Sequence, residues 1–175
     1  MTTTLRRFLQ GALDKKATLL AFLVGLATIA AAWGSQLIGG LVPCELCLEQ
    51  RLSYYWGLPV LAAILVLWNR LPLSVWYVAM AVAAAIFAWG TYMGAFHAGV
   101  EWGFWPGPTA CTGLGSTDLS FGDLSGEIEA VIPCDQVQFR LFGVSLAGYN
   151  ALISLAIVAL VLVAIGDQVR RYRKA

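Results

Sequence analysis

Residues 43–51 read PCELCLEQR and lie between two long apolar runs. Neither the run before them, residues 17–42, nor the run after them, residues 52–68, contains a charged side chain. A helix needs roughly 17–25 apolar residues to cross a hydrocarbon core of about 30 Å. The pattern therefore predicts two membrane-crossing helices, with a C-x-x-C pair and an arginine at the turn between them.

The whole chain has a composition that is typical of a membrane protein. Of its 175 residues 59% are hydrophobic and only 12% are charged, whereas a soluble domain carries about a quarter charged residues. Each apolar segment must be a helix, because no water in the bilayer can satisfy its backbone polar groups. We expect an all-α membrane protein, a four-helix transmembrane bundle forming one integral domain over residues 1–175. The expected spans are about 17–38, 50–68, 73–96 and 145–165.

The basic residues are distributed unevenly between the two sides of the predicted bundle. Nine of the eleven lie before span one, between spans two and three, or after span four. The positive-inside rule makes that side cytoplasmic. Both termini are then cytoplasmic, and the two extracytoplasmic loops cover about residues 39–49 and 98–143. The basic ends act as orientation signals, so we expect no nucleic-acid partner.

The second loop contains one short periodic segment. Phe121, Leu124, Ile128 and Val131 recur at spacings of three and four residues. Residues at this spacing lie on one face of a helix, and the acidic residues of the segment lie on its other faces. We expect a short amphipathic helix that rests on the membrane surface.

The four cysteines, at positions 44, 47, 111 and 134, all fall in the two outer loops, two in each. Disulfides form and persist in extracytoplasmic compartments. An even number of cysteines, two per loop, fits two disulfides.

The C-x-x-C pair favours redox chemistry. A helix start stabilises a thiolate, and Cys47 and Arg51 are four residues apart, on one helix face. Two alternatives remain open. A structural staple across so short a loop would gain little chain entropy. A metal site shared with Cys111 and Cys134 is disfavoured because their spacing does not match a zinc knuckle. We therefore expect no metal.

Cys111 and Cys134 on their own would indicate a structural disulfide that closes a loop. They lie on the same side of the membrane as the C-x-x-C pair, and two disulfides within exchange distance relay electrons through mixed disulfides.

Arg51 at the membrane boundary is either a snorkelling side chain or a hydrogen-bond donor to a lipid-soluble oxidant. Its place beside Cys47 favours the second. His97, the sole histidine, is more often a polar cap than a catalyst in such a place.

Taken together, these motifs resemble the disulfide bond formation protein B (DsbB) family over nearly the whole chain. The matching features are P-C-x-L-C-x-x-x-R at residues 43–51, His97 before the aromatic residues 102–105, C-T-G at residues 111–113, and the segment 134–150. The ordered set is specific, although each motif alone is weak. Phe139 and Tyr149 stand where tryptophan is more usual, which leaves the chemistry unchanged.

The resemblance implies a bacterial inner-membrane oxidase that takes electrons from a periplasmic, DsbA-like thioredoxin-fold protein. It also implies a quinone as cofactor, ubiquinone in first place and menaquinone as the alternative, drawn from the membrane pool. Arg51 matches the family's quinone-binding arginine, and His97 resembles a histidine near that site.

The resemblance further implies two redox disulfides, Cys44–Cys47 and Cys111–Cys134. Cys111 would form the mixed disulfide with the soluble partner, and Cys134 would exchange with the first pair. Cys47, next to the quinone, would pass the electrons on.

Two other interpretations compete with this one. An oxidase of the vitamin K epoxide reductase type carries its quinone-proximal C-x-x-C on a later span, whereas here the motif precedes span two. A structural membrane protein with disulfide-stapled loops would keep its cysteines oxidised and inert.

Overall fold

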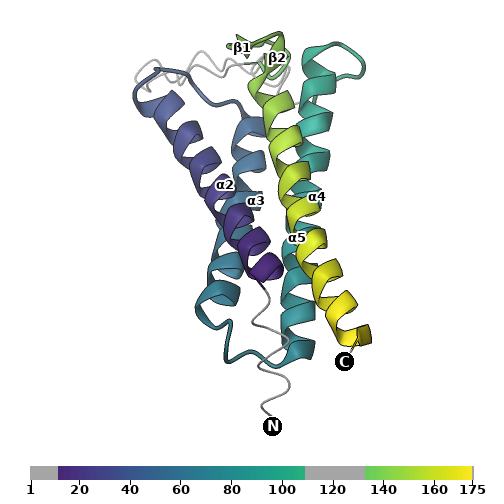
Figure 1. Ribbon diagram of the computed structural model, residues 1–175. Coiled ribbons are helices and arrows are strands. Elements are labelled where there is room, and N and C mark those ends of the chain that lie inside the picture. Colours follow the sequence, from purple (N-terminus) through teal and green to yellow (C-terminus); the bar gives the residue numbers. More distant parts are fainter. Residues whose placement is uncertain (1–11, 109–132, 175) are drawn as a thin grey trace, which may run out of the picture.

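The computed structural model describes residues 12–108 and 133–174. This part of the chain forms four long helices, each antiparallel to the next (Figure 1). They are α2 (Ala12–Leu37), α3 (Glu45–Val66), α4 (Leu73–Glu101) and α5 (Leu146–Lys174). Helix α4 packs against α3 and α5, and α2 packs against α5 and α3. The result is an up-down-up-down four-helix bundle.

Three of the described helices are long and apolar enough to cross a membrane, namely Leu13–Leu37, Leu73–Glu101 and Leu146–Lys174. Helix α3 does not qualify, because its first two turns carry charged and polar residues. The expectation of a helical membrane protein is thus supported. The fourth span and the orientation remain predictions.

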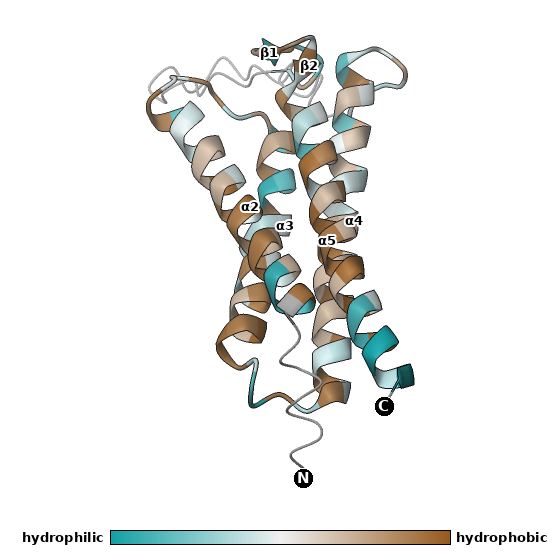
Figure 2. Cartoon of the chain, in the orientation of Figure 1, coloured by the Kyte–Doolittle hydropathy of each residue, from teal (hydrophilic) through white to brown (hydrophobic). Residues whose placement is uncertain are grey.

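Large apolar side chains point outwards from the bundle as well as inwards. Val78, Leu155 and Leu23 are 64%, 53% and 49% exposed, and Figure 2 shows hydrophobic residues along most of the helix length. Phe87 and Ile157 are fully buried in the core between the helices. A surface of this kind suits lipid, since bilayer chains are as apolar as the side chains that face them.

The helices extend beyond the predicted spans at both ends of the bundle. Helix α2 begins at residue 12 instead of 17, α3 begins at 45 instead of 50, and α4 ends at 101 instead of 96. Hydropathy marks only the part of a helix that lies in hydrocarbon, whereas backbone hydrogen bonding continues into the interface. As a result the first loop ends at Cys44, and Cys47 belongs to the first turn of α3.

A short hairpin precedes α5, and the sequence pattern did not predict it. Strand β1 (Arg140–Leu141) pairs with β2 (Val144–Ser145) in antiparallel register. The two residues of its turn, Phe142 and Gly143, have φ angles of 48° and 82°, as a type I′ hairpin turn requires. The amphipathic helix expected over residues 121–131 lies outside the described residues.

The start of α2 and the end of α5 meet at the end of the bundle opposite the hairpin (Figure 1). There Asp14, which lies before the first predicted span, is fully buried and accepts a hydrogen bond from Arg171. Arg171 also contacts Asp167 at 3.2 Å. The contact with Asp14 joins α2 to α5, whereas the contact with Asp167 lies within α5.

Helices α4 and α5 approach each other closely at Gly94. A Cβ atom at this position would lie 2.7 Å from the backbone nitrogen of Ala151, so a side chain would force the helices apart. This close approach lies one turn before His97 and brings it towards the α5 residues described below.

Candidate active site

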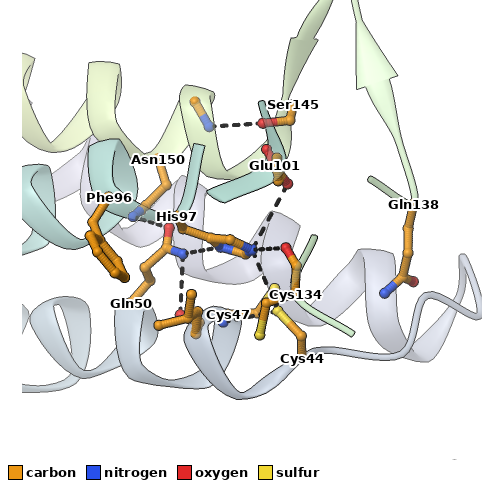
Figure 3. Close-up of polar contacts among 12 residues, drawn as sticks. Cys44, Cys47, Gln50, Phe96, His97, Glu101, Cys134, Gln138, Ser145 and Asn150 are labelled. Atoms are coloured by element: carbon orange, nitrogen blue, oxygen red, sulfur yellow. Dashed lines mark hydrogen bonds and ion pairs between the residues drawn. The ribbon is translucent and has the colours of Figure 1, made fainter. Parts of the chain in front are cut away.

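The C-x-x-C pair lies at the N-terminus of α3. Cys44 is the N-cap residue, and its sulfur accepts a hydrogen bond from the backbone N–H of Cys47 at 3.3 Å. Both cysteines are free thiols, and their Sγ atoms are 2.7 Å apart (Figure 3). A small movement would close this dithiol into a disulfide, because the helix start already holds the two sulfurs together.

The two thiols differ in acidity. The hydrogen bond from the Cys44 thiol lowers the pKa of Cys47, and the charge of Arg51 adds a smaller lowering against the effect of burial. The same hydrogen bond, together with burial, raises the pKa of Cys44. Cys47 is therefore the more acidic thiol of the pair, and its neighbour Cys44 lowers its pKa more than the arginine does.

Site-resolved alkylation of the reduced protein checks this assignment. We expect Cys47 to react at pH values below the ordinary thiol pKa of about 8.5, because a lowered pKa keeps the thiolate present until the pH falls through that lower value. A Cys44→Ala variant removes the largest cause, so the pKa of Cys47 should move up towards the ordinary range. Identical rate–pH profiles in the two proteins would contradict the assignment.

Arg51 is 8% exposed and points towards α2. Its guanidinium donates to the side-chain oxygen of Gln36 at 2.7 Å and to the carbonyl of Ala32 at 3.4 Å. It also lies 5.3 Å from the ring centroid of Trp33, within cation–π range. A snorkelling side chain would reach for water, whereas this one is held inside the bundle. Two of the five N–H donors of a guanidinium are used by these bonds.

His97 is buried on α4 and faces the cysteines (Figure 3). Its Nε2 lies 3.2 Å from the carbonyl oxygen of Cys134 and 3.7 Å from Cys44 Sγ. Its Nδ1 lies 2.7 Å from the side-chain nitrogen of Gln50. A carbonyl only accepts, and an amide NH₂ group only donates. The neutral imidazole is therefore protonated on Nε2 and accepts at Nδ1.

A chain of polar side chains inside the bundle holds this imidazole in place. Gln50 also donates to the carbonyl of Leu46 and accepts at 2.7 Å from Asn150 on α5. Asn150 in turn accepts a hydrogen bond from Tyr54 at 2.7 Å. The sequence reasoning missed this chain. The available signal was the presence of amides at membrane depth, since polar groups there are costly without partners.

Cys134 packs beside the first pair. It is disulfide-bonded and buried, and it belongs to the same apolar cluster as Cys44, Leu46 and Met93. Cys111, the cysteine expected to pair with it, lies outside the described residues. The structure therefore brings Cys134, Cys44, Cys47 and His97 together from three segments, which lie about 40–90 residues apart along the chain.

A cavity of about 420 Å³ opens between α2, α3 and α5 at this end of the bundle. Apolar residues of α2 and α5, such as Ala27, Ala31 and Ile153, form much of its wall. Cys47 and Arg51 also line it, as do Cys44, Gln50, His97 and Glu101. Its size and its mainly apolar wall with a few polar groups are typical of a site for a small organic molecule.

Three potential metal-binding atoms, from Cys44, Cys47 and His97, lie within 4.8 Å of one another. A metal would need a bare imidazole nitrogen, yet Nε2 carries the proton that the Cys134 carbonyl accepts. This arrangement suits a hydrogen-bond donor better than a ligand. The expectation that no metal is bound stays a prediction.

Comparison with known proteins agrees with this geometry. Residues 14–164 match the family model described as disulfide bond formation protein DsbB. The chain belongs to the DsbB family. No curated protein and no solved structure gave a significant match to it.

Membership of the DsbB family makes the protein an oxidoreductase of disulfide bond formation that works with a thiol–disulfide partner. The predicted resemblance is thereby confirmed. The roles of individual residues, the electron acceptor and the soluble partner remain proposals.

Proposed function

We propose that this DsbB-family protein oxidises a periplasmic, DsbA-like thioredoxin-fold donor and passes the electrons through its two cysteine pairs to a membrane quinone. The activity would sustain disulfide formation in secreted proteins at the bacterial inner membrane. One observation carries the proposal. Cys44, Cys47 and Arg51 line a single apolar cavity, and Cys44 belongs to the same buried cluster as Cys134.

The positions of the cysteines suggest the order of exchange. Cys44 and Cys134 belong to the same buried cluster, so we propose that the Cys134 thiolate attacks Cys44. This attack forms a Cys134–Cys44 bond, breaks the Cys44–Cys47 bond and releases Cys47 as a thiolate. Attack by the Cys111 thiolate on Cys134 would then form the Cys111–Cys134 bond and release Cys44. A leaving thiol of lower pKa departs faster, and the pKa of Cys47 is the lowered one.

The residues of the cavity fit a quinone ring. A bound quinone supplies a two-electron acceptor whose oxygens take up negative charge and protons. The unused N–H donors of Arg51 would hold one of these oxygens and stabilise the charge that develops on it. The apolar residues of α2 and α5 would contact the ring and the isoprenoid tail. Ubiquinone is the first candidate and menaquinone the second.

Anaerobic mixing of the purified protein with ubiquinone and a reduced thioredoxin-fold donor tests the proposal. We expect the quinone absorbance to fall in step with donor oxidation, with about one quinone consumed per donor disulfide formed. A disulfide-stapled structural protein would leave both reactants unchanged. Repeating the experiment with menaquinone ranks the two acceptors.

A further inference from the structure

Glu101 is a buried carboxylate at the edge of the cysteine site. It is the last residue of α4, one turn beyond His97, and its side chain is 7% exposed. One carboxylate oxygen lies 3.9 Å from His97 Nε2. The other, Oε2, is buried and has no hydrogen-bond partner among the described residues. Buried polar atoms are rarely left in this state, and each exception calls for an explanation.

Reoxidation of the first cysteine pair releases a proton at this place. The two sulfurs of the reduced pair lie 2.7 Å apart, and Cys44 is the one that keeps its hydrogen, because its pKa is the raised one. When the Cys44–Cys47 bond forms, the pair gives up two electrons and the Cys44 S–H bond breaks. A base within hydrogen-bond reach, directly or through one water molecule, must accept that proton.

His97 is the nearest basic side chain, yet both of its nitrogens are already committed. Nδ1 accepts the hydrogen bond from Gln50, and Nε2 holds a proton directed at the Cys134 carbonyl. Arg51 is protonated at all relevant pH values. Glu101 lines the same cavity as Cys44 and Cys47, and its charge acts on Cys47. It is the one cavity-lining side chain in the described part of the chain with an unused acceptor oxygen that is fully buried.

We propose that Glu101 accepts the proton that Cys44 loses when the first cysteine pair is reoxidised. Cys44 Sγ and a carboxylate oxygen of Glu101 lie 3.7 Å and 3.9 Å from the same His97 nitrogen, and one water molecule in the cavity between them would carry the proton. The proton moves from Cys44 to Glu101, the Cys44–Cys47 bond forms, and its two electrons pass to the acceptor, which is the quinone of the proposed function or the aromatic disulfide of the experiment below. Glu101 then returns the proton to an oxygen of the reduced quinone. This last step rests on the proposed function, whereas the first does not.

The first step is tested in quinone-free protein. In a C111S/C134S background only Cys44 and Cys47 remain, and a chromogenic aromatic disulfide reports two successive thiol releases. The first release comes from attack by Cys47 on the reagent, and it leaves Cys47 in a mixed disulfide with the other half of the reagent. The second comes from attack by Cys44, which must lose its proton. We expect Glu101→Gln to slow the second release at least about tenfold, as for loss of a general base, and the first by less than about twofold.

Glu49→Gln is the matched control, because Glu49 is an exposed carboxylate of α3 close to the same pair. Both releases should keep their wild-type rates in this variant. Second-release rates in Glu101→Gln within about twofold of wild type would overturn the proposal.

Equal slowing of both releases in Glu101→Gln would indicate a disturbed site. The two release rates of a Glu101→Ala variant, measured with and without added formate, then decide whether Glu101 accepts the proton. Partial recovery of its second release by added formate supports the proposal, and no recovery overturns it. If the wild-type protein fails to reduce quinone, the proposed function fails while the assignment of Glu101 still stands on the quinone-free rates.

Discussion

Replacing Cys47 with serine is expected to abolish quinone reduction completely. Cys47 is the cysteine of lowered pKa, and it lines the cavity together with Arg51. A serine hydroxyl neither forms a disulfide nor ionises near neutral pH, so no route leads from the second cysteine pair to the cavity. The measurement is anaerobic turnover with reduced donor and ubiquinone, followed by absorbance.

Cys44→Ser should abolish turnover too, because the pair cannot close without Cys44. In both variants the mixed disulfide between Cys111 and the donor should still form, visible as a covalent complex on a non-reducing gel. Leu48→Ala is the control, since Leu48 is an exposed side chain next to Cys47 and its loss should leave turnover unchanged. Full quinone-linked turnover in either cysteine variant would falsify the relay.

Replacing Arg51 with alanine is expected to raise the KM for quinone by about 10- to 100-fold. This range corresponds to the loss of one hydrogen bond from a charged donor, about 1.5–3 kcal/mol. The maximal rate of exchange with the reduced donor should change little, because Arg51 lies on the cavity side of the pair and faces α2. Steady-state kinetics with quinone and donor varied separately will distinguish the two effects.

Arg51→Lys should fall between the wild type and the alanine variant. A lysine keeps the charge but loses the planar fork that reaches Gln36 and the cavity at once. Arg140→Ala is the control, since Arg140 is an exposed arginine on β1 at the same end of the bundle. An Arg51→Ala defect confined to the donor protein would contradict the role assigned to this arginine.

The helices and the family could be predicted from local patterns. Long apolar runs demand helices in a bilayer whatever surrounds them, so each of the four predicted spans falls largely within a described helix, and four of the eight ends agree to within two residues. The motif order around the cysteines was specific enough to indicate the DsbB family, which the family model confirms. The limits of the helices were less accurate, because hydropathy does not detect interfacial turns such as the one that contains Cys47.

The composition of the site depended on helix packing. Gln50 and His97 are 47 positions apart along the chain, and Gln50 and Asn150 are 100 apart. A helical period shows which residues share a face but not which neighbouring helix that face meets. The state of His97 therefore could not be predicted from its position at the end of an apolar run.

The sequence by itself determined that this protein is a helical membrane protein of the DsbB family, with its four cysteines outside the predicted spans. Both conclusions rest on residues that are neighbours in the chain, through apolar runs and short motifs. Only the tertiary structure decided which nitrogen of His97 carries the proton, where Arg51 is held, and that Glu101 is buried beside the dithiol. Those properties arise from contacts between α2, α3, α4 and α5, and such contacts exist only once the helices have packed.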